Sequence, residues 1–361
     1  MTQRSHLSWK GIESMHDAAI ERHGANDRTY TAQVGVDPEL NSTVISLLYE
    51  DRENPARSII VGIAPDLGSN MFRFRVGAHD IIYCEPDLLK RRDFTGNFVL
   101  WPLPNRVRDK RYVYQGQTYS LEALKRPSGN EVLIHGLVFD RQWHYDQPVA
   151  RQDSVSVTTY VDITPESPFY QGYPFDSRLS LTYVLANNNV TVTYRVQNNG
   201  SKEMPFGFAL HPYFSTLSGR GDTLVSIPAD YVMEADDELL PTGRLLDVRS
   251  IMYAMFDLRQ PVPIANLKLD HVYTGLHKNA SAVIEYRKQA LRLRISASED
   301  FTHMVIYTPS SEAGGSFFCL ENQTCSTDAI NLSHRGLGEI AHLLELHPGE
   351  SSSGFIRYAI E

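Results

Sequence analysis

Three stretches of this chain alternate apolar and polar residues: VSVTTYV (Val155–Val161), VTVTYRV (Val190–Val196) and ALRLRIS (Ala290–Ser296). A period of two is that of a β-strand with one buried face and one wet face. Strands of this kind belong in antiparallel sheets. The asparagines at 187–189 lie just before the second run and suit a hairpin turn, because Asn tolerates positive φ. The chain lacks the regular strand–helix alternation of a doubly wound fold, so we predict an all-β protein: a large antiparallel β-sandwich with few short helices.

The texture of the sequence changes near residue 58. From Ser58 onward, short apolar or alternating runs recur between Gly, Pro, Asn and Asp, and we predict one sandwich domain over 58–361. Residues 1–57 are polar and irregular, and we expect an N-terminal extension that is partly helical. The stretch GIESMHDAAIERHG is compatible with one short helix that ends at Gly24. This extension is a candidate cap or subunit contact, and a homodimer is one expectation.

Charge and cysteine content narrow the partners and the compartment. The formal net charge of −9 argues against nucleic acid and anionic membrane as partners, since both need a basic face. Three cysteines give no disulfide framework, which favours a reducing compartment such as the cytoplasm. The first residues contain no apolar core of a secretory signal, and no apolar run reaches transmembrane length. We therefore expect a cytoplasmic protein that binds a small molecule and no membrane.

Two residues stand out as candidate acid–base groups. His211, in ALHPYFS, follows an apolar run, and Pro212 predicts that the strand ends or reaches an edge there. A core histidine bonded to a backbone carbonyl is the commoner fate of such a residue. Glu321, in GGSFFCLENQT, shares a strand face with Phe317 and Cys319. Burying an unpaired carboxylate is costly, so Glu321 either emerges at the rim of the sheet or is held there as a general base.

Three further residues are weaker candidates when read alone. His135 precedes a glycine inside the apolar run EVLIHGLVF, and such a glycine lets a ligand or another chain approach closely. Asp270, in LKLDHVYTGL, could merely start a turn. Arg106 begins a segment that reads as a hairpin with its turn at Gln115–Gly116. The sequence contains no H-x-H or H-E-x-x-H pattern and no G-x-S-x-G elbow, so a metal or a serine hydrolase is the weaker reading, and we expect no metal and no cofactor.

At these residues the chain is similar to the aldose 1-epimerase (galactose mutarotase) family. Six segments, in order and spread over roughly 58–361, carry the resemblance: IAPDLGSNMFRFRVGAHDIIY, NRVRDKRYVYQGQTYSL, IHGLVFDRQW, ALHPYF, LDHVYTGL and FFCLENQTCSTDAINL. The resemblance implies a large antiparallel sandwich with a sugar cleft on one face. It also implies an enzyme, an isomerase that interconverts the α and β anomers of a hexose.

The resemblance further implies a role for each candidate residue. Glu321 matches the general base that takes the proton from the C1 hydroxyl, and His211 matches the general acid that protonates the ring oxygen. His135 and Arg106 match residues that hold the sugar's hydroxyls and ring-oxygen region, and Asp270 matches an acceptor for sugar hydroxyls. We therefore expect the imidazole of His211 and the carboxylate of Glu321 to meet across a pyranose-sized hollow.

Two departures from the family pattern point to an outlying branch. Well-known members carry an Asn a few residues before the central His, where this chain has Gly207, and a Pro after the catalytic Glu, where it has Asn322. Three alternatives stay open: a non-catalytic sugar binder on the same fold, a polysaccharide-cleaving domain, which three tryptophans disfavour, and a hexose-6-phosphate mutarotase. In the last, Arg108, Lys110 and Arg111 would clamp the phosphate, unless they belong to a solvated hairpin.

Overall fold

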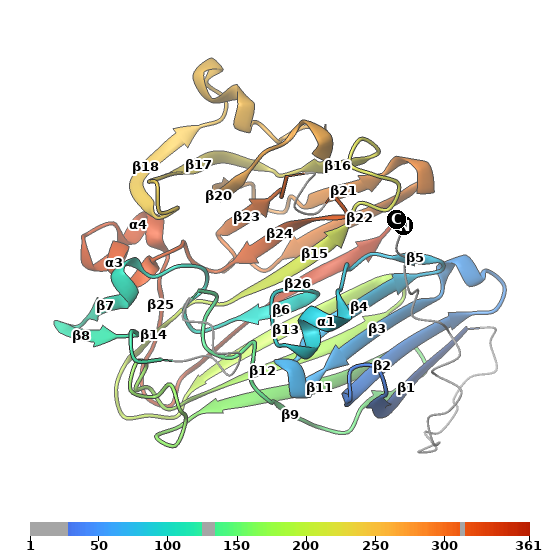
Figure 1. The fold of residues 1–361 in the computed structure, drawn as a ribbon, viewed down its shortest axis with the longest axis horizontal. Helices are drawn as coiled ribbons and strands as arrows, with labels where there is room; N and C mark the ends of the chain where they lie inside the picture. The colour runs from blue at the N-terminus through green and yellow to red at the C-terminus, as the bar shows by residue number, and fades with distance from the viewer. Residues whose placement is uncertain (1–27, 125–133, 311–314) are drawn as a thin grey trace.

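The computed structural model describes residues 28–124, 134–310 and 315–361. Two large antiparallel sheets dominate (Figure 1). The larger has the order β10–β11–β12–β13–β26–β22–β21–β16–β19, with β9 paired to β11. The other has the order β18–β17–β20–β23–β24–β15–β6. The prediction of an all-β antiparallel sandwich with few short helices is confirmed. The strands of the larger sheet are β9 (His144–Tyr145), β10 (Val149–Ala150), β11 (Ser154–Ile163), β12 (Ser177–Ala186), β13 (Asn189–Asn198), β16 (Thr223–Ser226), β19 (Val262–Pro263), β21 (Ala282–Tyr286), β22 (Leu291–Ala297) and β26 (Ser351–Ile360).

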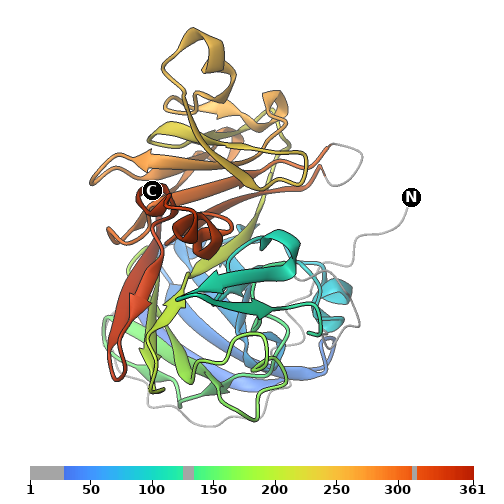
Figure 2. The same cartoon turned by 90° about the vertical axis from the view of Figure 1, so that its left-hand side faces the viewer.

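The seven-stranded sheet carries His211, Glu321 and Asp270, and most of its strands lie in the upper part of the molecule in Figures 1 and 2. The β7–β8 hairpin and the two-stranded pair of β14 with β25 flank it, and the described helices are short. The seven strands of this sheet are β6 (Asn97–Leu100), β15 (Ala209–Ser215), β17 (Ala229–Ala235), β18 (Pro241–Asp247), β20 (Asp270–Leu276), β23 (His303–Tyr307) and β24 (Phe317–Gln323). The strands of the two flanking pairs are β7 (Arg111–Tyr114), β8 (Gln117–Ser120), β14 (Met204–Phe206) and β25 (Leu344–Leu346). The α-helices are α1 (Pro86–Lys90), α3 (Ala329–His334) and α4 (Gly338–Ala341).

The alternating runs and turns of the sequence lie where the pattern places them. The three runs form β11, β13 and β22. A tight turn joins β12 to β13, and Asn187 takes a φ of +51° there. The turn between β7 and β8 falls at Gln115 and Gly116, both with positive φ. Local chemistry therefore fixes these hairpins without help from distant residues.

The predicted boundary at residue 58 is not a boundary in the structure. Residues 28–57, expected to be irregular, contribute β1 (Arg28–Asp37) and β2 (Ser42–Asp51) to a five-stranded sheet. The other strands of this sheet are β3 (Ile59–Ala64), β4 (Asn70–Val76) and β5 (His79–Asp80), and β2 pairs with β3 in register. Tyr30 and Ala32 of β1 are buried in the main core, so the first half of this strand packs against it. The helix expected to end at Gly24 lies outside the described residues.

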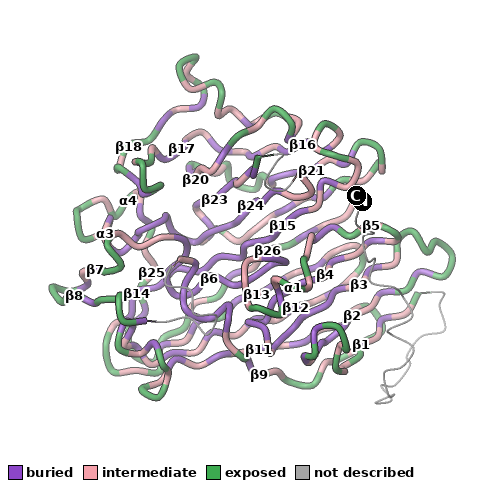
Figure 3. The backbone as a smooth tube through the Cα atoms, viewed as in Figure 1, coloured by how far each residue is buried: buried purple, intermediate pink, exposed green. Residues whose placement is uncertain are grey.

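Strands β15 and β24 divide their side chains between two clusters. Leu210, Phe214 and Leu320 point into the main core, whereas Tyr213 and Cys319 belong to a separate aromatic cluster on the other face. Both strands are buried along most of their length (Figure 3). A polar residue on the second face is therefore buried among rings while it stays outside the main core. In the described part of the chain, no helix is long and apolar enough to cross a bilayer.

Candidate active site

The two predicted acid–base residues are in direct contact. His211 on β15 and Glu321 on β24 lie on neighbouring strands, and the Nε2 of His211 is 3.1 Å from the Oε1 of Glu321. Their side chains are 7% and 2% exposed. The structure therefore corrects one expectation: no pyranose-sized hollow separates the two groups, which instead form a closed pair.

Pro212 explains how the pair fits between two paired strands. The strand neither ends at this proline nor lies at an edge of the sheet, the two outcomes that the sequence suggested, because β15 continues to Ser215 between β24 and β6. The amide of Tyr213 donates to Gly96 on the β6 side, so the missing N–H of Pro212 faces β24. Pairing of β15 with β24 passes from Ala209–Gln323 to Tyr213–Cys319 with nothing between. The ladder is thus open beside His211 and Glu321.

Aromatic rings surround the imidazole of His211. Phe98, across the strand pair on β6, stacks on it with ring centroids 4.5 Å apart and an interplanar angle of 18°. Tyr213 lies 5.3 Å away in a similar orientation. The ring of His135 meets the imidazole edge-on at 4.9 Å. Three side chains from three segments therefore fix the orientation of this ring.

His135 lies in a loop with a left-handed backbone, not inside a strand. Its φ is +68°, and its amide donates to the carbonyl of Asn105 at 2.8 Å. Gly136 also has positive φ, and a Cβ there would lie 2.4 Å from the carbonyl oxygen of Trp101. The close approach expected of this glycine is thus to another stretch of the same chain.

Arg106 and Asp270 complete the group of predicted residues. Arg106 follows Asn105, whose side-chain oxygen accepts a hydrogen bond from the Arg106 guanidinium at 3.1 Å. Asp270 is the first residue of β20 and pairs with Tyr307 on β23. Burial raises the pKa of Asp270, and the charge of Arg106 opposes that rise. The same guanidinium lowers the pKa of Glu321, so the three charged groups act on one another.

Burial dominates the protonation of the central pair. It raises the pKa of Glu321 well above its usual value, and the charge of Asp270 adds to the rise. Burial lowers the pKa of His211 to about 3. Both shifts favour the uncharged forms, a carboxylic acid beside a neutral imidazole. This form and the ion pair contain the same number of protons and differ only in which atom holds one of them.

Sequence reasoning missed two residues that contact the pair. Gln323 donates from its Nε2 to the Oε2 of Glu321 at 3.2 Å. A signal was present, because residues two apart in a strand share a face. Phe98, which stacks on His211, comes from a strand distant in sequence, and no local pattern indicates it. Among the described residues, no three His, Cys, Asp or Glu side chains gather as a metal ion would require.

A buried histidine near Gln323 is expected to make the protein acid-sensitive. His303 pairs with Gln323 across β23 and β24, is fully buried, and has a pKa lowered to about 3 by burial. The pKa of His303 in the folded protein lies below its value of about 6.5 in the unfolded chain. Between these two pKa values the unfolded chain binds a proton at His303 and the folded protein does not. The free energy of unfolding is therefore unaffected by the titration of His303 above about pH 6.5, and it decreases as the pH falls from there towards 3.

The measurement is urea unfolding between pH 7.5 and 4 for the wild type and His303→Gln. The amide of Gln can replace the imidazole Nε2, which lies 3.1 Å from the carbonyl of Ile340. We expect the variant to lose less stability on acidification, by about 1.4 kcal/mol for each pKa unit of depression removed. Equal acid slopes in the two proteins would show that His303 does not couple folding to pH.

A family model and several named relatives match this chain. A family model described as Aldose 1-epimerase matches residues 62–359. The Escherichia coli K12 protein YihR is 28% identical over 235 residues, 64% of this chain and 71% of that protein. The galactose mutarotase of Mus musculus is 25% identical over 264 residues, 71% of this chain and 66% of the mouse protein. The matched part thus spans about two thirds of the length of these relatives.

Solved structures share the fold. A galactose mutarotase-like protein from Clostridium acetobutylicum superposes with a TM-score of 0.76 at 22% identity, covering 92% of this chain and 98% of the other. The galactose 1-epimerase of Lactobacillus acidophilus NCFM gives a TM-score of 0.71 at 19% identity, with 92% and 99% covered. The family match over most of the chain confirms the resemblance that six short segments carried, and the chain belongs to the aldose 1-epimerase family, a family of isomerases.

Proposed function

We propose that the protein is a mutarotase that interconverts the α and β anomers of a free aldohexose. The observation that carries the proposal is the buried contact between His211 and Glu321. Ring opening of a hemiacetal requires one proton to leave the C1 hydroxyl and one to reach the ring oxygen. These two oxygens are bonded to the same carbon, so an acid and a base in contact with each other match their spacing.

The mechanism assigns one proton transfer to each side chain. The reaction starts from the ion-pair form, in which the Glu321 proton has moved to His211. Glu321 then takes the proton of the C1 hydroxyl, and His211 delivers its proton to the ring oxygen as the C1–O5 bond breaks. Rotation about C1–C2 in the open aldehyde then presents the other face of the carbonyl. On closure the two groups exchange roles: Glu321 returns its proton to the carbonyl oxygen, and neutral His211 takes the proton of the C5 hydroxyl as that oxygen attacks C1, which restores the starting protonation of the pair.

The neighbouring groups support this assignment. The charge of Arg106 lowers the pKa of Glu321 and so favours the carboxylate that the base requires. The edge-on ring of His135 and the stacked ring of Phe98 hold the imidazole in place. Asp270, half-buried at the start of β20, is proposed to accept hydrogen bonds from sugar hydroxyls. Arg106 and His135 are proposed to contact the hydroxyls and the ring-oxygen region.

The charge arrangement favours a free sugar over a hexose 6-phosphate. Arg108, a candidate phosphate ligand in the sequence, already forms an ion pair with Asp236 at 2.5 Å and lies 3.5 Å from Glu238. Arg111 lies 3.7 Å from Asp109. A phosphate would have to displace carboxylates from both arginines. The name of the mouse relative makes galactose the first sugar to try.

The test is anomer exchange, followed by polarimetry and by saturation-transfer NMR, on freshly dissolved galactose, glucose and their 6-phosphates. We expect faster exchange of a free hexose and little effect on the 6-phosphates, with Arg108→Ala indistinguishable from the wild type. Saturable hexose binding without acceleration would instead identify a non-catalytic binder. Preference for a 6-phosphate, lost in Arg108→Ala, would overturn the assignment of a free sugar.

A further inference from the structure

Asp328, the residue before α3, forms hydrogen bonds with the backbone of Arg106 and Arg108 and does not cap its own helix. Asp328 precedes Ala329 with a φ of +58°, and its side chain makes no helix-capping hydrogen bond. An aspartate at this position commonly accepts an amide of the helix it precedes. Here the Oδ1 of Asp328 accepts the amide of Arg108 at 3.1 Å. Its own amide donates to the carbonyl of Arg106 at 3.2 Å.

Asn331 extends this attachment along the same segment. Its Nδ2 donates to the Oδ1 of Asp328 at 2.7 Å and to the carbonyl of Arg111 at 3.0 Å. Its Oδ1 accepts the amide of Val113 at 3.2 Å. Two side chains of one short helical segment therefore hold the backbone from Arg106 to Val113. That helical segment follows β24, the strand that carries Glu321.

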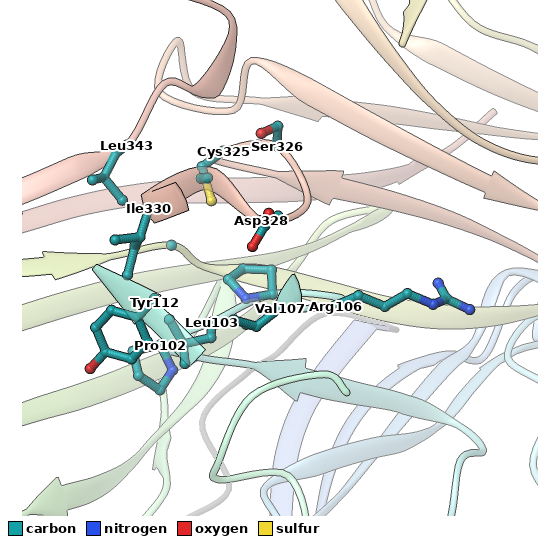
Figure 4. Close-up of a pocket in the computed structure, with 13 residues that line it drawn as sticks. Pro102, Leu103, Arg106, Val107, Tyr112, Cys325, Ser326, Asp328, Ile330 and Leu343 are labelled. Carbon is teal, nitrogen blue, oxygen red and sulfur yellow. The ribbon is translucent and has the colours of Figure 1, made fainter. Parts of the chain in front are cut away.

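The guanidinium of Arg106 depends on this backbone for its position. In the described part of the chain, no carboxylate lies within ion-pair distance of it, and its side-chain hydrogen bond goes to the adjacent Asn105. A small cavity of about 20 Å³ lies beside this loop and is lined by Asp328, Cys325, Leu343 and others, as Figure 4 shows. The Arg106 side chain extends away from these residues. Movement of the backbone would therefore move the charge directly.

We infer that Asp328 and Asn331 are positioning residues, which fix the Arg106 segment to the helix after the Glu321 strand and so set the place of the guanidinium charge relative to the Glu321 carboxyl. The catalytic consequence rests on the proposed function. The position of the Arg106 guanidinium is independent of that function, because its effect on Glu321 can be measured on the protein without a sugar. Asp328 is only 5% exposed, so a carboxylate here is costly unless these hydrogen bonds offset its burial.

The pKa of the Glu321 carboxyl reports where the Arg106 charge lies, provided that the other titratable groups around Glu321 are taken into account. The titratable groups that face it are His211 and Tyr213 on β15, Asp270 on β20 and Cys319 on its own strand. Arg106 is the positive group among those that act on it and lowers its pKa. Withdrawal of the guanidinium is therefore expected to raise the apparent pKa of the Glu321 carboxyl, the sign opposite to the effect of its presence.

The experiment is carbon NMR of protein labelled at glutamate carboxyls, with the Glu321 signal assigned by its loss in Glu321→Gln. Titrations compare the wild type, Asp328→Ala, Arg106→Met and the double variant. We expect Asp328→Ala to raise the apparent pKa in the same direction as Arg106→Met, by up to about one unit. The double variant should match Arg106→Met alone, because Asp328 acts through Arg106. Asp328→Asn retains the accepting Oδ1 and should stay near the wild type.

Two results would overturn the inference: a folded Asp328→Ala protein with the wild-type titration, or equal and additive shifts in the double variant. Should Asp328→Ala fail to fold, Asn331→Ala provides the same comparison with a smaller expected rise in the pKa of Glu321, and no rise there would overturn the inference. A wild-type protein without mutarotase activity would remove the proposed function and leave these titrations decisive. Where activity is present, the acidic limb of kcat/KM should move upward in Asp328→Ala and not in Asp328→Asn.

Discussion

Glu321→Gln is expected to slow anomer exchange by about 10²–10⁴-fold, the range typical of a positioned acid–base group. Gln has nearly the same shape and can keep the neighbouring Gln323 side chain in contact, but it cannot take a proton from the C1 hydroxyl. Polarimetry on a freshly dissolved hexose gives the rate, and NMR line-broadening of the same sugar gives the binding. Loss of rate with retained binding is the expected combination.

Stability provides the control for this variant. Burial already favours the neutral form of Glu321, so replacement by a neutral amide removes no buried charge pair. We expect the urea midpoint of Glu321→Gln to equal or exceed that of the wild type at neutral pH. A variant that is folded and keeps wild-type exchange would show that Glu321 is not the base. A matched His211→Gln variant should lose activity to a similar extent, because the reaction needs both transfers.

The largest stability effect is expected from Gly68→Ala. Gly68 has a φ of +77°, and a Cβ there would lie 1.7 Å from the carbonyl oxygen of Phe139. Its amide also donates to the carbonyl of Arg141 at 2.8 Å, which holds the two segments together. Neither backbone can withdraw without breaking this contact, so we expect a loss of about 4 kcal/mol or more in unfolding free energy. The measurement is urea denaturation followed by tryptophan fluorescence.

Gly116→Ala is the matched control for backbone conformation. Gly116 has a φ of +75°, close to that of Gly68, but a Cβ there would meet nothing within 4 Å. The Gly116→Ala variant should therefore lose only about 1–2 kcal/mol of unfolding free energy, the cost of an alanine in the left-handed conformation. A similar loss in both variants would mean that φ alone, and not the approach to Phe139, accounts for Gly68.

The sequence predicted those parts of the fold that depend on local pattern. The alternation of Val190–Val196 and the asparagines before it specify a strand and a tight turn without distant information. In β1 the same signal is weak, because only Tyr30 and Ala32 are buried and most of the other residues are polar or exposed. The strand through Pro212 was missed for another reason. Whether a proline ends a strand depends on which neighbour its missing N–H would face, and that neighbour is remote in sequence.

The site could be predicted as a set of residues but not as a geometry. Glu321 was identified as an anomaly because a carboxylate shares its strand face with apolar neighbours. Its contact with His211 depends on the register between β15 and β24, and the Phe98 ring depends on β6, so neither could be predicted from a local pattern. The contact of the pair, where an open hollow was expected, is likewise a property of packing.

Strand β26 has a consequence for how the molecule forms. In chain order it is the last of the described strands, yet it lies in the middle of the larger sheet, between β13 and β22. Before β26 is synthesised, the strands of this sheet form two separate groups, one ending at β13 and the other at β22. Each of these two strands then has an edge of unpaired backbone amides and carbonyls. Such edges readily bind other extended chains. We therefore expect the nascent chain to depend on chaperones until β26 emerges, and its assembly to be completed only after most of the polypeptide has left the ribosome.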